Sequence, residues 1–135
     1  MIELSNSAEL TLQPGQTAIF DTILLHTGCD TCTRSSTGSI KLRCCGPYEV
    51  RFTGNIGTSG DAGTAQLSIA MGGVTYPPST IISETATAGT LNAVERTFYL
   101  ANCCGDYDRL TVTNTGTTAL TIGANAIFSA RLVKC

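Results

Sequence analysis

The chain has 135 residues, a formal net charge of −2 and 13% charged residues, where an average soluble domain has roughly 25%. Such a length predicts a single domain over residues 1–135, large enough to have a core of its own. The charge balance excludes the strongly basic surface by which proteins bind nucleic acid or an anionic membrane. A weakly charged surface instead favours packing against copies of the same chain.

The N-terminal residues 1–9 contain neither the basic region nor the apolar run of a secretory signal peptide. No apolar run in the chain approaches the about 20 residues that a membrane-spanning helix needs. We therefore expect a protein made in the cytoplasm without a signal peptide and without membrane insertion. We expect residues 1–9 to form an N-terminal arm that contacts neighbouring copies.

From residue 40 onward the sequence has the period of two that half-buried strands produce. Apolar and polar residues alternate over residues 40–52, with an interruption near Gly46-Pro47. The alternation returns over residues 67–71, 110–113, 120–122 and 127–133. Turn residues such as Pro14-Gly15, Gly72-Gly73, Pro77-Pro78 and Asn114-Thr115-Gly116 separate these runs. Many short strands at this spacing predict a sandwich or a barrel.

Residues 81–100 are the one stretch in which a helix competes with a strand. Several alanines, leucines and glutamates favour a helix there, but Gly89 and four threonines disfavour it. The stretch is interpreted as strand, loop, strand.

Four segments in order carry a resemblance to a known family: Gly46-Pro47-Tyr48-Glu49-Val50-Arg51-Phe52, residues 65–73, Leu110-Thr111-Val112-Thr113-Asn114-Thr115-Gly116 and Ala130-Arg131-Leu132-Val133. They resemble the jelly-roll family of tumour necrosis factor and the globular heads of the first complement component. The bacterial branch is the most similar, namely the C-terminal domain of collagen-like exosporium glycoproteins of Bacillus and small proteins of gut bacteria and their phages. The resemblance implies an all-β jelly-roll sandwich of about ten antiparallel strands, assembled as a homotrimer for display and binding. This chain departs from that family by lacking a collagen-like stem and by having more cysteines.

The seven cysteines predict covalent bracing. Because the number is odd, at least one thiol has no partner within a single chain, and the terminal Cys135 is the candidate for a crosslink between subunits. The candidates for disulfides within the chain are Cys29, Cys32, Cys44, Cys45, Cys103 and Cys104. Six cysteines allow fifteen pairings, so the connectivity stays open. Neighbouring strand residues point to opposite faces, which predicts that Cys44 points into the core and Cys45 points outward.

A metal site is an alternative interpretation of part of this pattern. His26, the only histidine, precedes Cys29 and Cys32 at a spacing that zinc accepts, with Cys103 or Cys104 as a fourth ligand. Disulfides compete for the same thiols, so we expect no metal and no cofactor and keep a zinc-binding domain as an alternative. The sequence contains no Gly-x-Ser-x-Gly elbow and no recognisable acid and base pair, so we do not expect an enzyme.

These observations predict a structural protein that self-assembles on the outside of a particle. The main hypothesis is a disulfide-stabilised trimer that decorates a phage virion or binds a receptor. The alternative is a spore-surface or extracellular filament subunit polymerised through disulfides between subunits. We expect homo-oligomers, with other particle-surface proteins or host-surface glycans as partners and no nucleic acid. Two turn-rich loops without cysteine are the candidates for adhesion, and they comprise Thr58, Ser59, Gly60 and Asp61, and Tyr76, Pro77 and Pro78.

Overall fold

Two antiparallel sheets face each other in the computed structural model, which describes residues 1–33, 38–102 and 109–133, with the backbone alone for Cys32 and Thr33. The first sheet has the order β2 (Leu10–Leu12), β12 (Leu120–Ile122), β6 (Gly46–Thr58), β13 (Ile127–Leu132), β1 (Ile2–Ser5) and β3 (Thr22–His26), and β10 (Asn92–Asn102) also pairs with β6. The second has the order β4 (Thr31–Thr33), β5 (Ile40–Leu42), β11 (Arg109–Asn114), β7 (Gly63–Met71) and β8 (Val74–Thr75), and β9 (Ile81–Thr85) also pairs with β7. A 3-10 turn, η1 (Pro77–Ser79), joins β8 to β9.

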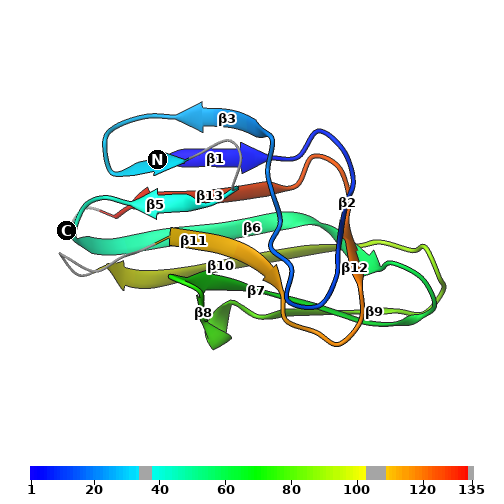
Figure 1. The fold of residues 1–135 in the computed structure, drawn as a ribbon. Coiled ribbons are helices and arrows are strands. Elements are labelled where there is room, and N and C mark those ends of the chain that lie inside the picture. The colour runs from blue at the N-terminus through cyan, green and yellow to red at the C-terminus, as the bar shows by residue number, and fades with distance from the viewer. Residues whose placement is uncertain (34–37, 103–108, 134–135) are drawn as a thin grey trace.

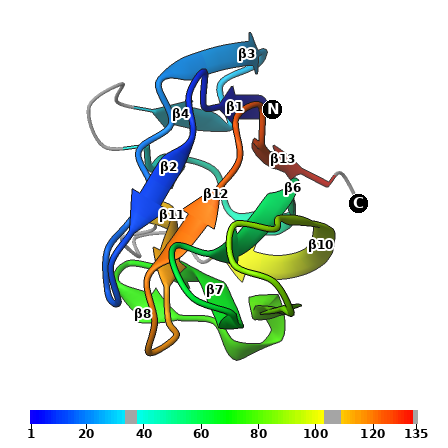
Figure 2. The ribbon, with the colours of Figure 1, turned by 90° about the vertical axis from the view of Figure 1, so that its right-hand side faces the viewer.

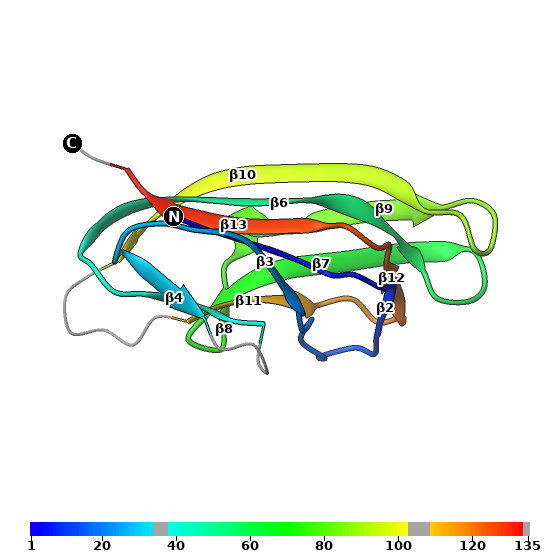
Figure 3. The same ribbon diagram turned by 90° about the horizontal axis from the view of Figure 1, so that it is seen from above.

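The sheets form the two layers of a sandwich. Figure 3 shows β10, β6 and β13 in one layer and β7, β11 and β8 in the other. Figure 1 shows β3 along one long side of the molecule and β10, β8 and β9 along the opposite side. Figure 2 looks onto the end where β2 and β12 lie. The all-β sandwich predicted from the sequence is confirmed, and so is the order of strand, loop and strand over residues 81–100, where β9 and β10 flank a loop.

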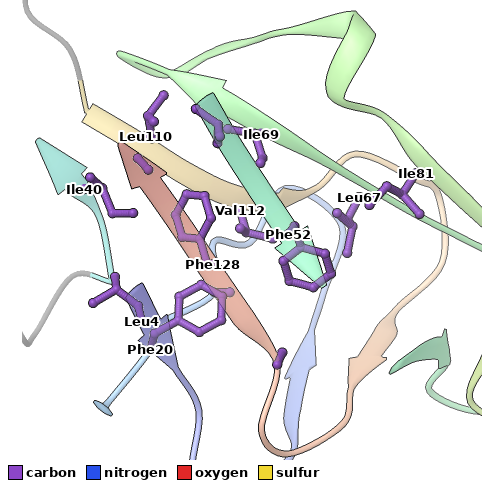
Figure 4. Packing of buried hydrophobic residues seen from close by; sticks show 14 of the residues in the cluster. Leu4, Phe20, Ile40, Phe52, Leu67, Ile69, Ile81, Leu110, Val112 and Phe128 are labelled. Atoms are coloured by element: carbon purple, nitrogen blue, oxygen red, sulfur yellow. The ribbon is translucent and has the colours of Figure 1, made fainter. Parts of the chain in front are cut away.

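The core lies between the layers and follows the alternation in the sequence. On β6, Tyr48, Val50 and Phe52 are completely buried, while Glu49 and Arg51 point away from the core. Figure 4 shows Phe52 and Phe128 among aliphatic side chains from both sheets. Each such side chain, when fully buried, contributes about 1.5–3 kcal/mol. Strands with this alternation therefore fold against each other and not singly.

The prediction that Cys44 points into the core is wrong, because its side chain is exposed. β5 ends at Leu42, residues 43–45 bend, and β6 begins at Gly46, whose φ of 135° lies in a region that favours glycine. The alternation starts anew after this bend, so the register that ends at Leu42 does not carry over to Cys44. The interruption thus falls just before the predicted Gly46-Pro47, and β6 continues through Pro47.

The N-terminal segment differs from the expected arm. Residues 2–5 form β1, which pairs with β13 on one side and with β3 on the other. Ile2 and Leu4 are buried in the core, with exposed fractions of 0% and 1%. These residues are part of the sheet because burying two aliphatic side chains stabilises the strand in its own chain.

Two buried asparagines hold the turns of the sandwich in place. Asn114 donates hydrogen bonds from Nδ2 to the carbonyl oxygens of Leu12 (3.0 Å) and Thr118 (2.9 Å), and its Oδ1 accepts one from the N–H of Gly116 (2.9 Å). Asn6 bonds in the same manner across residues 123–126. The turn predicted at residues 114–116 is therefore built around an asparagine side chain that substitutes for backbone partners.

We expect Asn114→Ala to lower the free energy of unfolding by about 2–3 kcal/mol, because buried backbone groups lose their partners. Urea unfolding followed by circular dichroism measures the change. The matched control is Thr117→Ala in the same turn, where the side chain is exposed, and its midpoint should stay within experimental error. An equal loss in both variants would contradict the role of the asparagine.

Candidate functional site

The turn between β6 and β7 forms a hydroxyl-rich surface at one end of the sandwich. Two shallow hollows there share Thr58, Ser59 and Gly60. The first, of about 310 Å³, is lined by residues 58–63, Thr118 and Ala119, and the second, of about 290 Å³, also involves Glu9, Thr11, Gly89, Leu91 and Thr121. Hydroxyl-bearing side chains line both hollows, but the exposed lining of the first is mainly apolar and that of the second mainly polar. The second hollow is therefore the better suited to polar ligands such as sugars.

The β6–β7 turn is braced from within. Thr58 is buried, its Oγ1 donates to the carbonyl oxygen of Asp61 (2.7 Å), and its N–H donates to Oγ1 of Thr85 (3.2 Å). The N–H of Ser59 donates to the carbonyl oxygen of Ala119 (3.0 Å). Ser59, Gly60 and Asp61 are exposed. Of the predicted contact residues in this loop, these three face solvent, whereas Thr58 holds the loop in shape.

The second predicted loop lies elsewhere on the molecule. Figures 1 and 3 place β8, which leads into η1, well away from the β6–β7 turn. The ring of Tyr76 packs against Phe98 with 5.4 Å between centroids, and Arg96 donates two hydrogen bonds to the carbonyl oxygen of Pro78 (2.9 and 2.7 Å). Pro77 and Pro78 are exposed. The structure thus does not bring the two loops together into one site.

An exposed apolar strip lies on β3, which we call the edge strip. It comprises Ile23, Leu24 and Leu25, whose exposed fractions are 50%, 52% and 40%, and Ile19 just before the strand, at 50%. Within the described residues β3 pairs with β1 alone, so its other side is an open sheet edge. The register between β3 and β1 shifts at Leu24; Ile23 lies opposite the buried Leu4 and Leu25 opposite Glu3, so the strip has apolar side chains on both faces of the sheet. The sequence analysis missed it, although three apolar residues in a row without alternation were a visible signal.

The opposite long side of the molecule has a different surface. Ile82 on β9, Tyr99 on β10 and Val74 on β8 are exposed there, with exposed fractions of 61%, 60% and 72%. These three residues come from three different strands, so they do not form a continuous row along one strand. The two long sides therefore present unlike surfaces.

Glu49 is the centre of a polar cluster on the outer face of the first sheet. It accepts hydrogen bonds from Nη2 and Nε of Arg131 (2.9 and 3.2 Å) and from the hydroxyl of Tyr99 (3.0 Å). The bonds from Arg131 hold the pKa of Glu49 below its ordinary value; desolvation opposes this shift, and Tyr99 adds to it. The cluster ties β6, β13 and β10 together across the sheet.

Asp30 lies where the two ends of the described chain meet. Its Oδ1 accepts a hydrogen bond from the N-terminal ammonium of Met1 (2.8 Å), and its Oδ2 accepts one from the N–H of Leu132 (3.1 Å). Desolvation raises the pKa of Asp30, but these two bonds outweigh it, so the pKa lies below the usual 3.8. The ionised carboxylate thus holds β1 and β13 against the corner between β3 and β4.

The cysteines and His26 take several different environments. Cys29 and Cys44 are exposed and carry free thiols, while Cys45 is exposed and disulfide-bonded. Cys103, Cys104 and Cys135, and the side chain of Cys32, lie outside the described residues. Nε2 of His26 donates a hydrogen bond to the carbonyl oxygen of Thr31 (2.8 Å), which occupies one of the two ring nitrogens a metal could use.

The described part of the chain shows neither a metal-binding cluster nor a membrane-spanning helix. Within it, no group of three or more His, Cys, Asp and Glu side chains has an arrangement that could hold a metal ion. No helix among the same residues has the length and apolar character needed to cross a membrane.

Solved structures, but no curated sequences, match this chain. No protein-family model matches the chain, and no curated protein matches it by sequence. The globular domain of zebrafish complement 1qA protein is similar in structure, with a TM-score of 0.68 and 14% identity over 98% of this chain and 96% of that one. For Eiger TNF from S. frugiperda the values are 0.72 and 14% over 99% and 92%, and for PRD1 vertex protein P5 they are 0.55 and 13% over 98% and 96%. The chain thus has the jelly-roll fold of tumour necrosis factor and the complement heads, as the sequence resemblance predicts.

We expect Glu49→Gln to lower stability at neutral pH and to have a shrinking effect as the pH falls. The folded-state pKa of Glu49 is below its unfolded value, so its contribution is complete above the ordinary pKa of 4.5 and is lost as the pH falls through the folded value. Urea midpoints of Glu49→Gln, Arg131→Gln and the double variant between pH 7 and pH 3 measure the coupling. A coupling that stays constant over this range would contradict the ion pair.

Proposed function

We propose that the protein is a non-enzymatic display domain that assembles as a homotrimer on the outside of a particle, most simply a phage virion. There it decorates the surface or binds a receptor. The edge strip on β3 is the observation that carries this proposal. The three similar structures, a complement domain, a TNF and a vertex protein, do not carry the names of enzymes, which supports the non-enzymatic assignment.

A second copy of the chain is the partner that the edge strip favours. An open, apolar sheet edge is an aggregation risk unless another surface covers it. With 13% charged residues and a net charge of −2, the chain offers little charge repulsion between copies. Covering Ile23, Leu24 and Leu25 with another copy would remove this apolar area from water.

The unlike long sides of the molecule favour a closed ring over a two-fold dimer. A two-fold interface brings the same patch together from both copies, whereas a ring joins two different patches of successive copies. The edge strip and the side formed by β8, β9 and β10 are such different surfaces. The family resemblance implies three copies, so we propose that the edge strip of one copy packs against the opposite side of the next.

On the surface of a particle, such a trimer would present its loops to a binding partner. The similarity to PRD1 vertex protein P5 supports that setting as an analogy at the level of the fold. Three copies would present three β6–β7 turns together, so that weak binding at each turn adds up to a useful avidity. Disulfides such as the one at Cys45 would stabilise the sandwich outside the cell.

A second candidate function rests on the free thiols. Cys29 and Cys44 are exposed, so either could link to Cys135 of another copy and build a spore-surface layer or an extracellular filament. A gel without reductant distinguishes the two functions, because a filament gives a ladder of covalent multimers and the trimer gives monomers. The zinc alternative is less favoured, since His26 already donates a hydrogen bond to Thr31.

We expect Leu24→Glu to convert the trimer into monomers, because a charge in the middle of the edge strip must otherwise be buried without a partner. Size-exclusion chromatography with light scattering, at several protein concentrations, measures the mass of the particle in solution. The control is Thr87→Glu, which adds the same charge at an exposed site between β9 and β10 and should remain trimeric. A monomeric wild-type protein, or trimers of Leu24→Glu, would contradict the proposed interface.

We expect Gly60→Tyr to abolish binding to host-surface glycans without affecting folding. A Cβ at residue 60 meets no other atom within 4 Å, so a side chain is accepted there, and a tyrosine would fill the hollows that share this residue. A glycan array, followed by titration of any hit, measures the binding. Gly60→Ala is the matched control and should bind like the wild-type protein. Equal binding by Gly60→Tyr would remove the β6–β7 turn as the contact surface.

A further inference from the structure

Two free thiols lie at the end of the sandwich where the described chain begins and ends. Cys29 is in the corner between β3 and β4, and Cys44 is in the corner between β5 and β6. Both line one hollow of about 360 Å³, together with Met1, Thr27, Gly28, Asp30 and Leu132. The two cysteines are 15 positions apart in the sequence, so it is the fold that brings them to the same hollow.

The β4–β5 ladder leads to the two corners that contain the cysteines. β4 and β5 are antiparallel, with Thr31 opposite Leu42, and the N–H of Arg43 continues the ladder by donating to the carbonyl oxygen of Asp30 (2.9 Å). Cys29 and Cys44 are the next residues after this contact, in the bends where the two strands end. A disulfide between them needs Cα atoms about 4.4–6.8 Å apart, and the shared hollow places both thiols in the same corner region.

Tyr48 holds the two corners together from the core side. Its hydroxyl lies 3.0 Å from the carbonyl oxygen of Asp30 and 3.1 Å from that of Cys44, and it accepts a hydrogen bond from the N–H of Cys44 (3.2 Å). The tyrosine is completely buried. Because the backbones of both corners are already positioned, a bond between the thiols would cost little additional ordering.

We propose that Cys29 and Cys44 form a reversible cross-strand disulfide that closes this end of the sandwich. The pairing rests on the proposed stabilisation by disulfides and specifies one bond of it, but it does not depend on the trimer. The bond would clamp the two corners beside Asp30, whose carboxylate binds Met1 and Leu132. Oxidation would thus fasten the corner that holds β1 and β13 in place.

The oxidant is a small-molecule disulfide of the glutathione class. The thiolate of one cysteine attacks this disulfide, forms a mixed disulfide and releases one small thiol. The thiolate of the second cysteine then attacks the protein sulfur of the mixed disulfide and releases the second small thiol. Each protein thiol loses one proton and one electron, and the oxidant takes up both electrons and both protons.

The test is a disulfide map of the full-length protein after incubation with oxidised glutathione. Remaining thiols are alkylated, and the protein is digested with trypsin and with a protease that cuts before aspartate. Residues 21–29 then contain Cys29 as their only cysteine, and residues 44–51 contain Cys44 and Cys45. We expect a product that joins these two peptides and also contains the peptide bound to Cys45 through its own disulfide. We further expect a loss of two reactive thiols per chain and recovery of these two thiols after reduction.

Two variants assign the bond to individual residues. Cys44→Ser should leave Cys29 alkylated, whereas Cys45→Ser should retain the link between the two peptides. Fragmentation of the joined wild-type peptide also distinguishes Cys44 from Cys45, so the assignment does not depend on the folding of either variant. An alkylated Cys29 in the oxidised wild-type protein, or a bond from Cys29 to another cysteine, overturns the proposal. The oligomeric state is measured on the same samples, so failure of the pairing and failure of the trimer are separate results.

Discussion

The pairing of β6 with its neighbours is the constraint on which the rest of the sandwich depends. β6 runs from Gly46 to Thr58 and pairs with β10 along one side and with β13 and β12 along the other. A single strand thus sets the register of three others. Its inward side chains Tyr48, Val50 and Phe52 are completely buried against the second sheet. A slip of one residue would turn all of them outward, so the register and the core determine each other.

The surfaces proposed to take part in binding and assembly lie outside this central pairing. The β6–β7 turn follows the last residue of β6, and the corner with Cys44 comes just before its first residue. The edge strip is on β3, the strand of the first sheet farthest from β6 on that side. The rigid middle of the sandwich therefore positions a polar loop end, a thiol-bearing end and an apolar edge in fixed relation to one another. Such an arrangement favours assembly and display.

Much of the fold followed from local patterns. The alternation over residues 48–52 and the turn at Asn114 depend on near neighbours in the sequence, so their interpretation needed no tertiary information. The predicted orientation of Cys44 was wrong because the chain bends between β5 and β6 and the alternation restarts after the bend. Alternation alone does not reveal such a bend. The edge strip was missed for a different reason. Ile23, Leu24 and Leu25 have the composition of a buried strand, and only the sheet order shows that they lie at an open edge.

The sequence by itself determined the class of the protein, because periodicity, turn residues and low charge act through short-range chemistry. Only the tertiary structure decided which residues are neighbours. The placement of Cys29 and Cys44 in one hollow depends on how two corners of the fold come together, and the meeting of Met1, Asp30 and Leu132 depends on sheet order. Contacts between residues far apart in the chain arise from the packing of the whole core, which no local pattern encodes.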